Sequence, residues 1–150
     1  MGMKISIACD HGGYALKEKV KGWLTEAGHE VRDFGCYGTE SVDYPDFALP
    51  AAEAVAGGEA DRAVLICTTG IGVSISANKV KGVRCALCSD TMTARMTREH
   101  NDTNALAMGA GVVGENLAKE ILFTWIDTPF SQAPRHQRRI DKISAYESKH

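Results

Sequence analysis

The sequence has no long hydrophobic run and little excess charge of either sign. No apolar stretch approaches the roughly 20 residues that a membrane-spanning helix needs, and the first residues lack the charged-then-apolar layout of a secretory signal peptide. The formal net charge is only −2, which argues against nucleic acid as the main partner. We therefore expect a cytoplasmic protein that binds neither a membrane nor nucleic acid.

Cysteine is also scarce, with five residues in a chain of 150. An odd number of cysteines in apolar or loop segments does not indicate a disulfide framework, so we expect reduced thiols. Cys85 and Cys88 have the spacing of half a zinc site, but the sequence has no second pair. We therefore predict no metal site.

Apolar, β-rich runs alternate with helical patterns along the whole chain. The predicted strands cover residues 4–9, 29–35, 62–67, 83–88 and 104–109, and the predicted helices cover 14–28, 45–57, 71–80, 90–100, 114–127 and 134–147. Strands that alternate with helices predict a parallel sheet with helices on both faces. The expected fold class is α/β: one domain of residues 1–150, with a three-layer, Rossmann-like, five-stranded parallel sheet and a C-terminal helix.

The segment from Cys67 to Gly72 is the first candidate site, because ligands of such sheets bind at the carboxyl ends of strands. Gly70 and Gly72 allow a ligand to approach the backbone, and the amides at the start of the next helix attract an anion. The same features favour the thiolate form of Cys67. The segment lacks the Walker lysine, the third glycine of the dinucleotide motif and the arginine of a cysteine phosphatase loop. A purely structural cysteine at a strand end is the alternative interpretation.

Further polar residues lie near the ends of predicted elements. They are Asp10 and His11 after the first strand, Tyr44 before the second helix, His100 and Asn101 at the end of the fourth helix, and Arg135 and Arg139 on the last helix. Asp10 could simply cap a helix, and His100 could simply be a cation stabilised by the helix dipole. Arg135 and Arg139 share one helix face, which suits bidentate phosphate binding but is also typical of a solvated surface.

Seven segments carry a resemblance to a known family. They read CDHGGYALK, DYPDFA, AVAGGEADRAVLICTTGIGVSISANK, GVRCAL, REHNDTNALAMG, VVGENLA and RHQRRI. In this order they resemble ribose-5-phosphate isomerase B, a family that includes galactose-6-phosphate isomerase subunits, over nearly the whole chain. The resemblance implies an enzyme without metal or cofactor that interconverts aldose and ketose sugar phosphates through an enediolate.

The resemblance also implies catalytic roles. Cys67 would be the base that moves a proton between C1 and C2 of the sugar, and His100 would open the sugar ring. Asp10 would lie near the hydroxyl protons, and Thr69 would hold or shuttle the proton on the C1 and C2 oxygens.

Other residues would bind the substrate. The backbone amides that would stabilise the enediolate belong to Thr68, Thr69, Gly70, Ile71 and Gly72. The phosphate would be held by His11, Arg135 and Arg139, and the sugar would be lined by Tyr44 and Asn101. Because sites in this family form between two subunits, we expect a homodimer with shared sites, possibly assembled further into a tetramer.

One turn departs from the family pattern. Many relatives have an arginine before VVG that helps to hold the phosphate, whereas this turn reads Gly109-Ala110-Gly111. Ribose 5-phosphate and ribulose 5-phosphate, of the pentose phosphate pathway, are the expected substrates. Tetrulose 4-phosphate, allose 6-phosphate and galactose 6-phosphate stay open as alternatives, as does a non-enzymatic phosphate- or nucleotide-binding regulator, which would not need both Cys67 and His100.

Overall fold

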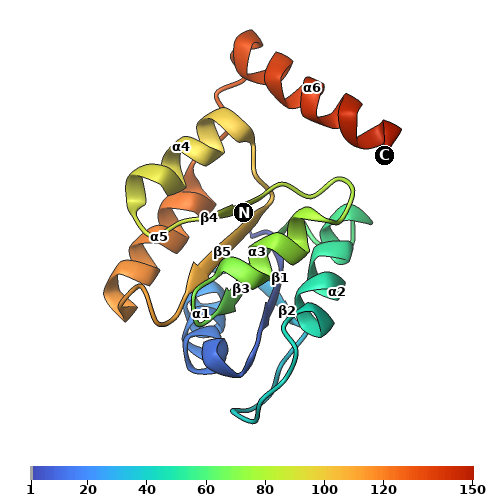
Figure 1. Ribbon diagram of the computed structural model, residues 1–150. Helices are drawn as coiled ribbons and strands as arrows, with labels where there is room; N and C mark the ends of the chain where they lie inside the picture. The colour runs from blue at the N-terminus through green and yellow to red at the C-terminus, as the bar shows by residue number, and fades with distance from the viewer. Residues whose placement is uncertain (1) are drawn as a thin grey trace.

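Five parallel strands form one sheet in the computed structural model, which describes residues 2–150 (Figure 1). The strands are β1 (Lys4–Cys9), β2 (Glu30–Asp33), β3 (Arg62–Cys67), β4 (Cys85–Leu87) and β5 (Ala105–Gly109). All four strand pairings are parallel, and the order across the sheet is β2-β1-β3-β5-β4. The predicted five-stranded parallel sheet is confirmed. The two edge strands, β2 and β4, are shorter than predicted.

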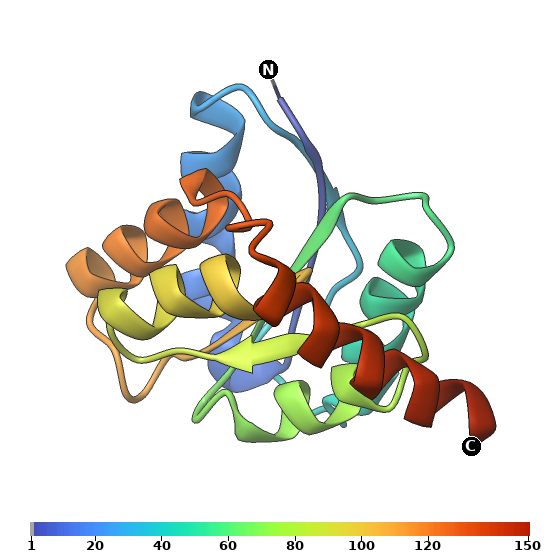
Figure 2. The same cartoon turned by 90° about the horizontal axis from the view of Figure 1, so that it is seen from above.

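Helices cover both faces of this sheet. They are α1 (Tyr14–Glu26), α2 (Pro45–Ala56), α3 (Ile71–Asn78), α4 (Thr91–Asn101), α5 (Glu115–Asp127) and α6 (Pro134–Lys149), and a short 3-10 turn, η1, spans His11–Gly13. Figure 2 shows α1, α4 and α5 on one side of the sheet and α2 and α3 on the other. The three-layer arrangement was therefore predicted correctly.

Two apolar cores join the sheet to its two helical layers. Side chains alternate across a strand, so Ile66 points into the core beneath α1 and α5 whereas its neighbour Cys67 points toward α2 and α3. The second core is rich in alanine, including Ala48, Ala51 and Ala52 of α2. The sulfur of Cys67 therefore lies at the boundary between a tightly packed core and the end of the sheet.

The strand order reverses direction between β1 and β3. The chain leaves β1 toward β2 on one side, and it leaves β3 toward β5 and β4 on the other. Helices diverge at such a point, and the crevice left at the carboxyl ends of the two strands is where open α/β sheets bind ligands. Asp10 follows β1 and Cys67 ends β3, so both border this point.

The last helix, α6, lies outside the three layers and packs against α4 (Figures 1 and 2). Its buried residues are His136 and Ile140. Near its far end, Glu147 Oε1 accepts a hydrogen bond of 2.9 Å from the amide of Gly82. Most of α6 is therefore exposed, and its attachment to the rest of the chain is narrow.

Candidate active site

Cys67 sits where β3 meets the amino end of α3. Its side chain is 5% exposed, and its sulfur accepts a hydrogen bond of 3.1 Å from the amide of Gly70. Gly70 has a φ of 78°, in the left-handed region that favours glycine. This backbone bend turns the Gly70 amide back toward the sulfur and lets α3 begin at Ile71. The sulfur therefore lies against a backbone amide at the N-terminus of α3, where a negative charge that forms on a bound ligand would be stabilised.

The segment after Cys67 is braced by the turn that follows β5. The amide of Ala110 donates to the Cys67 carbonyl, and the amide of Gly111 donates to the Thr68 carbonyl, both at 2.8 Å. Thr69 is exposed, and its Oγ1 accepts a hydrogen bond of 3.2 Å from the amide of Ile71. The turn that departs from the family pattern therefore contacts the predicted catalytic loop directly.

Asp10 and His11 lie beside that loop. The amide of Asp10 donates to the Ile66 carbonyl at 3.2 Å, which places Asp10 against the end of β3. Asp10 Oδ1 accepts a hydrogen bond of 3.1 Å from the Gly13 amide, so the carboxylate does cap η1. His11 Nδ1 accepts from the Val42 amide at 3.2 Å, so a neutral His11 ring carries its proton on Nε2.

Tyr44 joins the same group from the start of α2. Its ring lies so close to Gly72 that a Cβ on Gly72 would sit 2.6 Å from Tyr44 Cζ, so a larger residue at position 72 would have to displace the ring. The structure therefore brings together, at the carboxyl end of β1 and β3, nine of the predicted site residues: Asp10, His11, Tyr44, Cys67, Thr68, Thr69, Gly70, Ile71 and Gly72.

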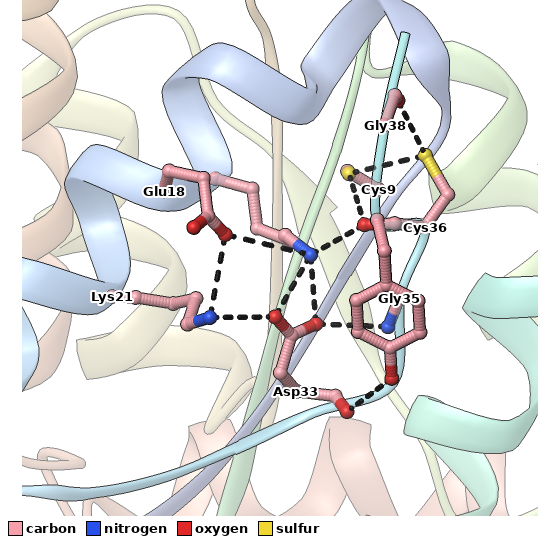
Figure 3. Close-up of polar contacts among 9 residues, drawn as sticks. Cys9, Glu18, Lys21, Asp33, Gly35, Cys36 and Gly38 are labelled. Carbon is pink, nitrogen blue, oxygen red and sulfur yellow. Dashed lines mark hydrogen bonds and ion pairs between the residues drawn. The ribbon is translucent and has the colours of Figure 1, made fainter. Parts of the chain in front are cut away.

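A buried charged cluster supports this end of the sheet (Figure 3). The ammonium group of Lys17, which is fully buried, donates to Asp33 Oδ1 and Oδ2 at 2.8 and 2.9 Å and to the Cys36 carbonyl at 2.6 Å. Lys21 contacts the same carboxylate at 2.8 Å. The amide of Cys36 in turn donates to the Cys9 carbonyl at 2.9 Å. The cluster thus fixes the segment that leads to Val42 and Tyr44, and nothing in the sequence pattern revealed it.

His100 and Asn101 lie elsewhere. They end α4, and α4 returns from the carboxyl end of β4 to the amino end of β5, so both residues sit at the opposite end of the sheet from Cys67. They line a cavity of about 160 Å³ together with Arg84, His136, Arg139, Ile140 and Ile143. The Arg84 guanidinium donates to the carbonyls of Asn101 and Asp102 at 2.9 and 2.8 Å, which secures the end of α4.

The two predicted phosphate ligands on α6 belong to this second group. Arg135 and Arg139 are exposed, and within residues 2–150 neither forms an ion pair with a carboxylate. Arg139 lines the same cavity as His100, whereas Arg135 does not. Two unpaired guanidinium groups beside a histidine form a basic surface that suits an anion.

The predicted site is therefore split into two halves within one chain. Cys67, Asp10, His11 and Tyr44 occupy one end of the sheet, whereas His100, Asn101, Arg135 and Arg139 occupy the other. No group of three metal-ligating side chains gathers in the part of the chain that the structure describes. In the same residues, no helix is long and apolar enough to cross a membrane.

Comparison with known proteins identifies the family. A sequence model described as Ribose/Galactose Isomerase matches residues 5–143. The chain belongs to this family. The predicted class of enzyme, an aldose–ketose isomerase of phosphorylated sugars, is thereby confirmed.

Individual relatives cover almost the whole chain. Ribose-5-phosphate isomerase B of Escherichia coli is 47% identical over 146 residues, 97% of each chain. D-erythrulose-4-phosphate isomerase of Pectobacterium atrosepticum is 39% identical over 149 residues, 97% of this chain and 95% of the relative. A solved structure of Clostridium thermocellum ribose-5-phosphate isomerase B is 54% identical with a TM-score of 0.96, and the match covers 98% and 99% of the two chains. The fold is therefore shared end to end, while the relatives' names span more than one sugar phosphate.

Proposed function

We propose that this isomerase interconverts ribose 5-phosphate and ribulose 5-phosphate through an enediolate, without metal or cofactor. The observation that carries the proposal is the Cys67 thiol, which accepts the Gly70 amide at the N-terminus of α3. Two relatives named for this reaction are 47% and 54% identical to the chain over nearly its full length. Residues 1–150 would form a single domain, and the enzyme would act in the pentose phosphate pathway. The five free thiols support a reducing, cytoplasmic location.

The proton transfer between carbon atoms is assigned to Cys67. Its thiolate takes the C2 proton of the open-chain aldose, and the electron pair moves to give an enediolate with negative charge on O1. The thiol then returns the proton to C1, while the O2 proton moves to O1 with the help of Thr69 and Asp10. The amides from Thr68 to Gly72 stabilise the charge on oxygen, as an oxyanion hole does.

Ring opening is assigned to His100, and this assignment requires a second chain. Because His100 and Cys67 lie at opposite ends of the sheet in one chain, a complete site needs the His100 half of a partner. We therefore propose a homodimer in which each site combines the Cys67 end of one chain with His100, Asn101, Arg135 and Arg139 of the other. Both chains would contribute identically, as a two-fold axis requires. Pairing of such dimers into a tetramer is left open.

An exposed apolar surface supports this mode of assembly. Ile71 and Ile75, one turn apart on α3, are 52% and 55% exposed. Leu87 on the edge strand β4 is also exposed, and it lies beside Gly70. Exposed apolar side chains that gather on a helix and on a neighbouring edge strand are typical of a protein interface. The phosphate would then lie between His11 of one chain and the two α6 arginines of the other.

The main alternative is a different sugar phosphate. Gly111 offers no cation at the turn beside Thr68, so a tetrulose 4-phosphate or an allose or galactose 6-phosphate could place its phosphate differently. A phosphate-binding regulator is less well supported, because it gives no role to a thiol hydrogen-bonded by its own loop.

A substrate panel tests the proposal. Ribose 5-phosphate, a tetrose 4-phosphate, allose 6-phosphate and galactose 6-phosphate are each incubated with the enzyme in buffer containing a chelator, and ketose formation is measured. We expect the highest kcat/KM with ribose 5-phosphate. A higher value for another sugar would reassign the substrate. Absence of isomerisation with every sugar would favour a regulator, and release of inorganic phosphate would favour a phosphatase.

A further inference from the structure

His136 is the one buried histidine of α6, and it lies directly against His100. Its side chain is 5% exposed, and the two imidazole centroids are 4.1 Å apart with the rings inclined by 34°. His136 Nδ1 is 2.7 Å from Ser131 Oγ, a hydrogen bond that fixes the rotation of the His136 ring. A buried, hydrogen-bonded ring thus forms one wall against which His100 rests.

The surroundings of His136 favour its uncharged form. Burial lowers the pKa of His136, and the neighbouring His100, Arg135 and Arg139 lower it further, whereas Glu99 acts in the opposite sense. Arg84, on the other side of the shared cavity, adds another positive charge. A neutral His136 does not repel a proton on His100, so His100 can exchange a proton with a substrate while its neighbour stays unchanged.

The same contact joins α6 to α4. The amide of Ser131 donates to the Glu99 carbonyl at 3.1 Å, so the segment that carries the hydrogen-bond partner of His136 is tied to the residue before His100. Ile140, the other buried residue of α6, lies one turn further along the helix. Ile140 thus anchors α6, while His136 both anchors α6 and contacts the ring of His100.

We propose that His136 is a positioning residue for ring opening, which holds the His100 imidazole in the orientation that reaches the anomeric oxygen. The proposal rests on the proposed function, since it presumes that His100 opens the ring. Ring opening moves the anomeric hydroxyl proton to a base and returns a proton to the ring oxygen, and both transfers need hydrogen-bond distances. A rotation of an unsupported imidazole would lengthen them, and a misplacement of about 1 Å can reduce a rate by about 100-fold.

The experiment separates ring opening from proton transfer at carbon. Ribulose 5-phosphate has no ring form to open, because its O5 carries the phosphate. Exchange of its C1 hydrogen for deuterium, followed by NMR in D2O, therefore requires Cys67 but not ring opening. Conversion of cyclic ribose 5-phosphate requires both. The variants are His136→Leu, His136→Phe, Ser131→Ala and, as a matched control, Ile140→Ala.

We expect His136→Leu to lower kcat/KM for ribose 5-phosphate by about 10- to 100-fold and to change C1 exchange by less than about 3-fold. His136→Phe keeps a flat ring against His100, so its kcat/KM for ribose 5-phosphate should fall less than that of His136→Leu. Ser131→Ala should show the same intermediate loss as His136→Phe. Ile140→Ala loosens α6 and its arginines but keeps the His136 ring and its Ser131 hydrogen bond, so it should lower both rates by the same factor. Circular dichroism and thermal unfolding establish that each variant is folded.

Other results would overturn the proposal in distinct ways. If His136→Leu lowers exchange as much as isomerisation, His136 acts only by anchoring α6. If neither rate changes in a folded His136 variant, the contact has no role in catalysis. Should His136→Leu fail to fold, Ser131→Ala and His136→Phe decide between the same outcomes. If the wild-type enzyme neither isomerises nor exchanges these sugars, the proposed function itself fails.

Discussion

The backbone amide of Gly70 points at the sulfur of Cys67, 3.1 Å away. This hydrogen bond holds the sulfur at the N-terminus of α3, next to the predicted substrate-binding loop. Other cysteines of the chain lie in different surroundings. Burial raises the pKa of Cys85 to about 12, and burial also raises that of Cys9 to about 12 although Lys17 opposes it. Those two thiols stay protonated at neutral pH.

The first prediction concerns the carbon base. Cys67→Ala should lower kcat for ribose 5-phosphate by about 10²–10⁴-fold, the loss typical of a general base. The Cys67 side chain accepts one hydrogen bond, from the Gly70 amide, and lies at the edge of the alanine-rich core, so the variant should remain folded. Steady-state kinetics and thermal unfolding measure the two effects separately.

Cys85→Ala is the matched control for that loss, and it should keep wild-type turnover. Iodoacetamide should inactivate the wild-type enzyme by modifying Cys67, and bound substrate should slow the inactivation. Near-normal turnover of a folded Cys67→Ala variant would refute the assignment of the base.

The second prediction follows from the separation of the two half-sites along the sheet. The variants Cys67→Ala and His100→Ala are mixed with each other in equal amounts, mildly denatured and refolded together. Each heterodimer would then contain one intact site, built from the Cys67 half of one chain and the His100 half of the other. Random pairing in a symmetric dimer should restore about a quarter of wild-type activity.

A second pair of variants checks this complementation. Cys67→Ala and Asp10→Ala alter the same end of the sheet, so their heterodimers contain no intact site and should stay inactive. Recovery in this control, or monomeric sedimentation of a fully active wild-type enzyme, would be incompatible with shared sites.

The alternation of strands and helices was enough to predict the sheet, because a buried parallel strand and an amphipathic helix differ in period. The same alternation also predicts at which end of the sheet His100 lies, and the sequence interpretation did not use this. A helix between two parallel strands has to return to the amino end of the sheet, so a residue that ends α4 cannot lie beside one that ends β3. The strand order could not be predicted, since it depends on pairings between residues far apart in the chain.

Lys17 and His136 show why other parts of the site were missed. Lys17 looks like one of several exposed lysines on α1, and its burial depends on Asp33 and the Cys36 carbonyl, 16 and 19 residues away. His136 looks like part of a basic surface, and its burial depends on α6 packing on α4. In both cases the partner comes from another element, which local periodicity does not encode.

The third prediction concerns the buried ammonium group of Lys17. Lys17→Met should lower the free energy of unfolding by about 3–5 kcal/mol, because it removes the fully buried partner that donates two hydrogen bonds to the Asp33 carboxylate and leaves only Lys21 beside it. Lys19→Met is the comparison: Lys19 is exposed and pairs with Glu115 at 3.4 Å, so its removal should cost about 1 kcal/mol or less. Urea unfolding at neutral pH measures both. Equal effects of the two variants would contradict a structural role for the Lys17 cluster.

The fourth prediction is a pH dependence at Asp33. Burial alone would raise the pKa of Asp33, but hydrogen bonds from Lys17, Lys21 and the Gly35 amide outweigh burial and hold the pKa below its usual range. A depressed carboxyl pKa stabilises the folded state above the unfolded pKa of about 3.9, and this stabilisation is lost as the pH falls through the folded pKa.

The difference in unfolding free energy between wild type and Asp33→Asn should therefore be constant above about pH 5 and shrink below about pH 4. Urea unfolding across this range measures it. Glu59→Gln removes an exposed pair with Arg32 and should show little difference at any pH. A difference for Asp33→Asn that does not change with pH would mean that the carboxylate charge contributes nothing.

The fifth prediction tests the turn that lacks an arginine. Gly111 is not among the residues with a positive φ, so its backbone accepts any L residue. A Cβ there would lie 3.1 Å from both Thr68 Cγ2 and the Thr68 carbonyl, so Thr68 must shift by a few tenths of an ångström. Gly111→Ala measures the effect of that shift alone, and Gly111→Arg adds the guanidinium.

If ribose 5-phosphate is the natural substrate and its phosphate lies near this turn, Gly111→Arg should lower KM relative to Gly111→Ala. A charge-assisted hydrogen bond contributes about 1.5–3 kcal/mol, which corresponds to about a ten- to hundredfold change in affinity. If the natural substrate places its phosphate elsewhere, the added arginine should instead raise KM for that sugar and lower it for the pentose. Kinetics on tetrose, pentose and hexose phosphates distinguish these results. Identical KM values for Gly111→Arg and Gly111→Ala with every sugar would show that the turn does not face the phosphate, and the grip on the substrate would then rest on His11 and the α6 arginines.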